Sequence, residues 1–130
     1  MEFEYQFKRV PFNYNKLNAK DNYGMTAFMC ACRNGHKDVV QLLLEHSDPN
    51  IDLNANADNR WTAVIWACRN GHTDVVQLLL NHSDPTIDRN AKDNNGRTAF
   101  IWACRKGHKD VVQLLLEHSD QKIDFNAKDN

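Results

Sequence analysis

The sequence contains no long apolar run and no excess of charge of either sign. No stretch approaches the roughly 20 apolar residues that a membrane span needs. With 16 basic and 17 acidic residues the formal net charge is −1, so the whole molecule is drawn neither to nucleic acid nor to an anionic membrane. The first residues, MEFEYQFKRV, are too charged for a secretory signal. We therefore expect a cytoplasmic or nuclear protein with no nucleic-acid or membrane partner.

The patterns that would support catalysis or metal binding are also missing. The 5 glycines form no phosphate-binding loop, and no carboxylates are paired as at a catalytic pocket. No cysteine or histidine has a second ligand at C-x-x-C or H-x-x-x-H spacing. The His-Ser-Asp run that starts at His46 consists of adjacent residues, which cannot converge as nucleophile, base and orienting group. We expect no enzyme activity, no catalytic residues, no metal and no cofactor.

What the chain does contain is one segment repeated three times. The copies are TAFMCACRNGHKDVVQLLLEHS, TAVIWACRNGHTDVVQLLLNHS and TAFIWACRKGHKDVVQLLLEHS. They start at Thr26, Thr62 and Thr98, so the period is 36 residues (62 − 26 = 98 − 62). A fixed period between about 20 and 50 residues is typical of stacked repeat proteins.

Each copy has the signals of two short helices. A threonine hydroxyl can cap the first helix by accepting from its free backbone N–H groups, and the glycine at 35, 71 or 107 ends that helix. Asp38 and its equivalents place negative charge at the positive end of a second helix. The apolar run of that helix, VVQLLL, covers more than one face, so the helix needs neighbours on two sides. Stacked copies would supply them.

The repeat resembles the ankyrin repeat, a unit of about 33 residues with a T-P-L-H-x-A helix start. The resemblance covers about residues 15–130 and rests on four motifs in the first copy. These are Asp21-x-x-Gly24-x-Thr26-Ala27, Ala31-Cys32-x-x-Gly35-His36, Val39-Val40-x-Leu42-Leu43-Leu44 and Asn54-Ala55. It implies an all-α repeat solenoid of stacked helix-turn-helix units, with β-turn fingers that project at right angles to the helices. It also implies a structural role for the histidine after each glycine, bonded across the loop between the helices.

The chain departs from the ankyrin pattern in several places. Each repeat is three residues longer than the family norm, and Pro49 and Pro85 replace the usual glycine stop after the second helix. In the middle finger, Ala57 and Arg60 replace the expected aspartate and glycine. A positive φ at Arg60 would cost on the order of 1 kcal/mol.

The repeat pattern divides the chain into a cap and three units. We expect an N-terminal capping segment at 1–14 and repeats at 15–56, 57–92 and 93–130. Cys32, Cys68 and Cys104 should each lie in a separate layer, about 8–10 Å apart, which is too far for a disulfide. We expect them to be buried as small apolar residues, and Cys30 to be partly exposed.

Positions that vary between the copies are the candidates for partner recognition. In ankyrin repeats the finger tips and the inner helix surfaces line a concave groove that holds protein partners, so we expect an acidic or aromatic segment of another protein to bind there. Trp and Arg are enriched at binding hot spots. The alternative is that Trp66 and Trp102 only pack between layers. The candidate residues are Tyr23, Met25, Arg33, Asn59, Trp61, Trp66, Arg69, Asn95, Arg97, Trp102, Arg105 and Lys106.

The last helix has the same apolar residues as the internal ones, and no capping sequence follows it. Either the chain is part of a longer or engineered array, or Val112, Leu115 and Leu116 form a face through which two molecules pair as a homodimer and scaffold. Asn54, Asn90 and Asn126 match a turn asparagine that is a hydroxylation target in ankyrin repeats. Their expected structural role is to stabilise the finger's turn through side-chain to backbone bonds.

Overall fold

The computed structural model describes residues 14–46, 51–82, 87–118 and 125. The expected cap at 1–14 therefore lies almost wholly outside the described residues, as do Pro49 and Pro85. A short 3-10 helix, η1 (Tyr14–Asn18), precedes three helix pairs. The pairs are α2 (Ala27–Arg33) with α3 (Lys37–Glu45), α4 (Ala63–Arg69) with α5 (Thr73–Asn81), and α6 (Ala99–Lys106) with α7 (Lys109–Glu117).

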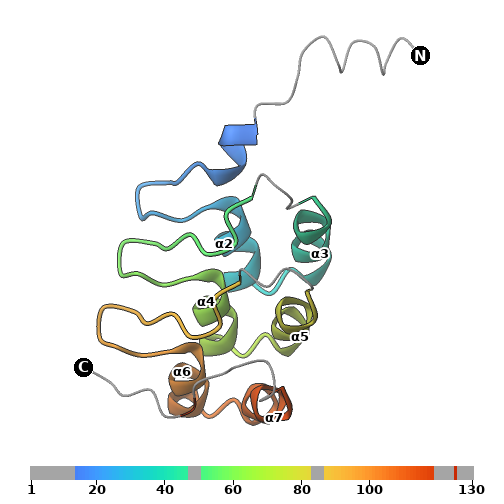
Figure 1. Ribbon diagram of the computed structural model, residues 1–130, viewed down its shortest axis with the longest axis vertical. Helices are drawn as coiled ribbons and strands as arrows, with labels where there is room; N and C mark the ends of the chain where they lie inside the picture. Colours follow the sequence, from blue (N-terminus) through green and yellow to red (C-terminus); the bar gives the residue numbers. More distant parts are fainter. Residues whose placement is uncertain (1–13, 47–50, 83–86, 119–124, 126–130) are drawn as a thin grey trace.

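The pairs stack into two columns, as Figure 1 shows. α2, α4 and α6 form one column and contact each other in order, and α3, α5 and α7 form the other. Three loops project from the first column on the side away from the second. This arrangement confirms the predicted all-α repeat solenoid. None of the helices in the described residues has both the length and the apolar character needed to cross a membrane.

The helices begin and end where the sequence predicts. The hydroxyls of Thr26, Thr62 and Thr98 each accept a hydrogen bond from the backbone N–H three residues on, at 3.2–3.3 Å. These bonds satisfy one of the free donors of the first turn. The glycine that ends each first helix has a φ of 72–73°, the left-handed conformation that a Cβ disfavours.

The second helices show that each layer is sheltered by its neighbours. α3 and α7 have the same sequence, KDVVQLLLE. α3 buries Leu44 and leaves Leu42 56 % exposed, whereas α7 buries Leu114, the equivalent of Leu42, and leaves Leu116 51 % exposed. Each end helix buries the face that turns toward α5, because in the described residues only that side has a neighbouring second helix. α5 buries both faces, through Val75, Val76, Leu79 and Leu80.

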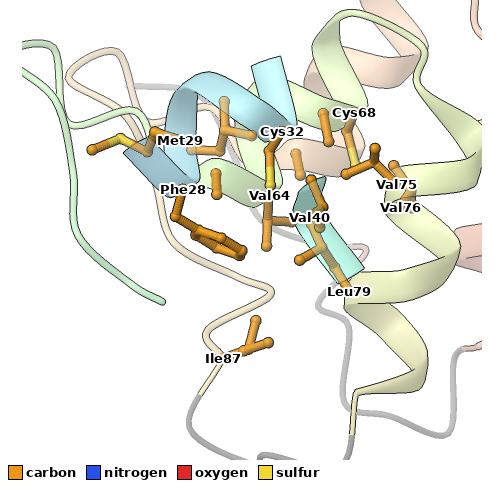
Figure 2. Close-up of a cluster of buried hydrophobic side chains, with 14 of the residues drawn as sticks. Phe28, Met29, Cys32, Val40, Val64, Cys68, Val75, Val76, Leu79 and Ile87 are labelled. Atoms are coloured by element: carbon orange, nitrogen blue, oxygen red, sulfur yellow. The ribbon is translucent and has the colours of Figure 1, made fainter. Parts of the chain in front are cut away.

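The core is continuous between layers, as Figure 2 shows for side chains from α2 to α5 and for Ile87. Cys32 and Cys68 have no exposed surface, as predicted, and burial raises the pKa of Cys68 to about 12. Cys104 was expected to be buried in the same way, but it is exposed. It occupies the same place in its helix, and in the described residues no further helix pair covers it. Cys30 is half-buried.

Leu115 also departs from expectation, because it was predicted to lie on an exposed C-terminal face. It is 2 % exposed and lies on the side of α7 that faces the rest of the stack. Val112 is half-buried, and only Leu116 of the three predicted residues is exposed. An apolar run that covers two faces of a helix does not reveal which face a neighbour covers.

The fingers are tight turns tied to one another. In each finger, one backbone N–H donates to the carbonyl oxygen four residues on, at 2.9–3.0 Å. The donors are Asp21, Ala57 and Asp93. Neighbouring fingers are joined by Asp58 N–H to Tyr23 O and by Asn94 N–H to Asn59 O, both 3.2 Å. In the middle finger Arg60 has a φ of 65°, so the chain keeps the glycine's left-handed conformation there despite the strain.

Two kinds of side chain join successive repeats. The Nε2 atoms of His72 and His108 lie 2.8 Å from the carbonyl oxygens of Arg33 and Arg69. These bonds reach the preceding repeat, and so correct the expected bond across the loop of the same repeat.

The turn asparagines also act between repeats. Asn54 Oδ1 accepts from Asp88 N–H at 2.7 Å, and Asn18 Oδ1 accepts from Asp52 N–H in the same way. These are side-chain to backbone bonds, the kind predicted for the turn asparagines, and they join successive repeats. Asn126 lies outside the described residues.

The histidine contact makes two equivalent glycines unequal. Gly71 and Gly107 both have a φ of 72°. A Cβ on Gly71 would lie 2.6 Å from His108 Nδ1, whereas a Cβ on Gly107 would meet nothing within 4 Å.

We therefore expect Gly107→Ala to lower the free energy of unfolding by about 1 kcal/mol, from backbone strain alone. Gly71→Ala should lower it by about 3 kcal/mol, because it also displaces the His108 ring and its bond. Urea unfolding of the two variants measures the difference. Equal losses would contradict the inter-repeat role of the histidine.

Candidate functional site

Arginines and tryptophans alternate along the face where the first helices meet the fingers. Trp61, from the middle finger, lies at the centre. Its ring centroid is 4.4 Å from that of Trp66 on α4 and 5.0 Å from that of Trp102 on α6, and both pairs are tilted. Such pairs contribute about 0.5–1.5 kcal/mol beyond the area they bury. The three rings therefore join the middle finger to two successive first helices.

The arginine near the end of each first helix lies over at least one of these rings. Arg33 Cζ is 4.9 Å from the Trp66 centroid, and Arg105 Cζ is 5.6 Å from that of Trp102. Arg69 Cζ lies over both Trp61 and Trp102, at 5.0 and 5.3 Å. Cation–π contacts of this kind contribute about 0.5–2 kcal/mol, more where the pair is desolvated. Arg69 is half-buried, while Arg33 and Arg105 are exposed.

A cavity of about 400 Å³ opens between the first two fingers and helices α2 and α4. Its lining combines aromatic surface, one exposed cation and two acidic side chains. We call this cavity, with the adjoining tip of the third finger and the exposed end of α6, the finger–helix groove. The cavity is lined by Asp21, Tyr23, Met25, Cys30, Arg33, Ala57, Asp58, Asn59 and Trp66.

One polar contact differs between the second and third repeats. Trp102 Nε1 donates to Asp93 Oδ2 at 2.8 Å, and Asp93 is 2 % exposed. The position equivalent to Asp93 in the middle finger is Ala57, and the buried Trp66 Nε1 has no acceptor among the residues that the structure describes. A buried donor without a partner costs about 1–3 kcal/mol. The middle repeat therefore has an unpaired indole beside the cavity.

The carboxylate at this position also orders the finger itself. Asp93 Oδ1 accepts the backbone N–H groups of Asn95 and Arg97, both at 2.9 Å. Asp21 does the same for Tyr23 and Met25 in the first finger. In the middle finger Asn59 Oδ1 accepts instead from Trp61 N–H, at 3.2 Å.

The structure divides the predicted partner-binding residues by accessibility. Tyr23 is 75 % exposed, and Trp66 is half-buried. Of the others, Arg33, Asn59, Asn95, Arg105 and Lys106 are exposed, and Arg69 and Arg97 are half-buried.

Three predicted surface residues are buried, and this corrects the expectation for them. Met25, Trp61 and Trp102 are 6, 8 and 9 % exposed. Trp61 fills the space between Trp66 and Trp102, and Trp102 turns its indole N–H to Asp93. The packing alternative holds for Trp102 and only in part for Trp66. Positions that vary between the copies therefore include both exposed residues and buried residues that pack on one another inside the stack.

Carboxylates that the sequence did not single out also line the cavity. Asp21 and Asp58 contribute to its wall, beside Cys30, and Asp93 holds the third repeat's indole. The signal for the indole pair was present in the repeat alignment. Aspartate and tryptophan occur together in the third copy, whereas the second has Ala57 with Trp66 and the first has Asp21 with Cys30.

In the described residues, no three His, Cys, Asp or Glu side chains gather as a group that could hold a metal ion.

The family model described as ankyrin repeats, in three copies, matches residues 10–57 and 50–129. Among curated proteins, none matches the sequence significantly.

The indole contact predicts opposite effects for two substitutions. Asp93→Ala should lower the free energy of unfolding by about 3 kcal/mol, because it leaves Trp102 Nε1 and two finger N–H groups without their acceptor. Ala57→Asp should raise it by about 1 kcal/mol, because it supplies that acceptor to Trp66. Urea unfolding measures both. Asn94→Ala, at an exposed neighbour in the third finger, is the control and should change stability by less than about 0.5 kcal/mol. A stability loss on Ala57→Asp would count against the contact.

Proposed function

The chain belongs to the ankyrin repeat family, and from that premise we propose that it is a non-catalytic module that binds another protein through the finger–helix groove. Ankyrin repeats are generally protein–protein interaction modules, and the family is typically non-catalytic. A fold of this kind serves many unrelated targets, so the binding mode must be argued from the groove itself.

The observation that carries the proposal is the cavity between the first two fingers. Five of the partner-binding residues that the sequence predicts lie in its lining: Tyr23, Met25, Arg33, Asn59 and Trp66. Tyr23 is the most exposed large apolar side chain in the described residues. An aromatic ring left in water beside a concave surface is typical of a binding site rather than of packing.

The chemistry of the groove favours a segment that is both aromatic and acidic. Tyr23 and the half-buried ring of Trp66 offer apolar surface to an aromatic side chain inside the cavity. Arg33, Arg105 and Lys106 are exposed cations along the same face, and can pair with carboxylates that flank that side chain. The Asp21 carboxylate within the lining already accepts two backbone N–H groups of its own finger, which offsets part of its repulsion.

A second candidate function is self-association as a scaffold. It is favoured by the exposure of Leu116 on α7 and of Cys104 on α6, at the end of the stack. For localisation we propose the cytoplasm or nucleus, which is supported by the four cysteines being unpaired thiols.

Charge reversal tests the groove. We expect Arg33→Glu with Arg105→Glu to weaken partner binding about tenfold or more, because repulsion replaces attraction at two exposed positions. Arg69 is left unchanged, because its guanidinium packs on Trp61 and Trp102 and its reversal would disturb the fold. The partner is first recovered from a cell lysate with the wild-type chain, and its affinity for each variant is then measured by calorimetry.

The matched control is Lys37→Glu with Lys109→Glu. These lysines are also exposed, in the first turns of α3 and α7, and their reversal changes the net charge by the same amount. The control should bind the partner like the wild type. Equal affinity of both double variants, with circular dichroism showing them folded, would refute the groove as the binding surface.

A further inference from the structure

The exposed large apolar side chains of the described residues gather in only three places. One is Tyr23 in the finger–helix groove. The other two are the ends of the second-helix column. Val39 and Leu42 on α3 are 48 and 56 % exposed, and Leu116 on α7 is 51 % exposed. The two ends of the stack therefore carry apolar surface that the groove does not explain.

The two end faces are different halves of the same repeated interface. The exposed face of α3 corresponds to residues that later repeats turn toward the preceding layer: Val75 and Val111, equivalent to Val39, have no exposed surface. The exposed face of α7 corresponds to residues that earlier repeats turn toward the following layer. Leu44 and Leu80, equivalent to Leu116, are 7 and 3 % exposed. The molecule builds this interface twice, between α3 and α5 and between α5 and α7.

The first-helix column repeats the pattern. Ala27 at the start of α2 is exposed, whereas its equivalents Ala63 and Ala99 are 1 and 2 % exposed. Cys104 on α6 is exposed, whereas Cys32 and Cys68 are fully buried. The N-terminal end thus shows the surface that normally faces backward, and the C-terminal end shows the surface that normally faces forward.

A polar contact is left open at the same two ends. His72 and His108 each bond the carbonyl of the arginine that ends the preceding first helix, and each ring rests on the glycine two residues after that arginine. His36 is exposed, at the N-terminal end. At the C-terminal end, Gly107 has no neighbour within 4 Å of an added Cβ. The N-terminal end therefore carries the exposed histidine, and the C-terminal end carries the glycine against which such a histidine packs inside the stack.

We propose that a second copy of this chain docks head to tail, with the α3 face of one molecule on the α7 face of the next. The inference rests on self-association, the second candidate function. It replaces a symmetric dimer, in which two C-terminal faces meet, with a head-to-tail contact between two different faces, which we call polar docking. Val112 and Leu116 would meet Val39 and the other exposed residues of α3, as Val76 and Leu80 meet α7 inside the molecule. His36 of the second copy would rest on Gly107 and bond the Arg105 carbonyl. A contact between two different faces leaves one of each free, so the assembly grows beyond two copies.

Two single variants and their mixture test this arrangement. Leu42→Glu disables only the α3 face, and Leu116→Glu disables only the α7 face. We expect the wild-type mass, measured by sedimentation velocity from micromolar to millimolar concentration, to rise past the dimer. Each variant alone should be monomeric. An equimolar mixture should form a species of two copies and no larger one, because each variant supplies the face that the other has lost.

The matched controls are Gln41→Glu and Gln113→Glu. They add the same charge to the same two helices at exposed positions, and the equivalent Gln77 stays half-exposed even between two neighbours. These glutamines therefore face outward, and both controls should associate like the wild type. His36→Ala should raise the dissociation constant about fivefold, by the loss of one hydrogen bond and one ring contact.

The possible failures are distinguishable. A wild-type chain that is monomeric throughout would overturn both the polar docking and self-association. Association that survives Leu42→Glu but not Leu116→Glu would overturn the polar docking alone and leave a symmetric C-terminal pair. A mixture that stays monomeric, with both variants folded by circular dichroism, would also overturn the polar docking. None of these results bears on the finger–helix groove.

A measurement on the unmodified chain covers the case in which a variant does not fold. Docking would cover Cys104 as Cys32 and Cys68 are covered, while Cys30 in the groove would keep its exposure. We expect alkylation of Cys104 by iodoacetamide, resolved by mass spectrometry, to slow relative to that of Cys30 as the protein concentration rises. A constant ratio of the two rates would overturn the proposal.

Discussion

The apolar contact between successive second helices is the constraint on which this structure depends. A nine-residue helix with five aliphatic residues cannot bury them against its own partner helix, and it is covered only when another layer lies on each side. The middle helix α5 meets that condition, and its four buried residues show it. The end helices α3 and α7, identical in sequence, meet it on one side only. Burial in this molecule is thus a property of position in the stack as much as of residue type.

The same constraint explains where surface is left for recognition. Layer packing joins each first helix to its second helix and to the neighbouring first helices, and the fingers project on the side away from the second helices. There the contacts change from aliphatic to aromatic and cationic. Trp61 joins two layers through Trp66 and Trp102, and Arg69 lies over two of these rings. Ring and cation–π contacts hold the centre of the groove together, whereas Tyr23 and Arg33 are exposed at its opening.

The near identity of the copies has a further consequence for assembly. In a stack of unlike layers, the two ends would have no reason to fit each other. Here the forward face of α7 and the backward face of α3 are copies of surfaces that already fit inside the molecule, down to the histidine and its glycine seat. The apolar residues of the second helices, VVQLLL, are the same in all three copies, whereas the fingers and first helices differ at positions such as Ala57 and Asp93. Stacking is therefore conserved across layers while the groove differs from one layer to the next.

The sequence by itself determined the repeat, the threonine caps of its first helices and its solenoid fold, because these follow from local signals that recur every 36 residues. Thr62 caps its helix as the sequence predicts. Only the tertiary structure decided which side chains are reachable. Trp102 is buried because Asp93 and Trp61 lie beside it, and Leu115 is buried because its side of α7 has a neighbour. The exposure of a side chain depends on its neighbours in space. Two helices with the same sequence, such as α3 and α7, can therefore bury different residues.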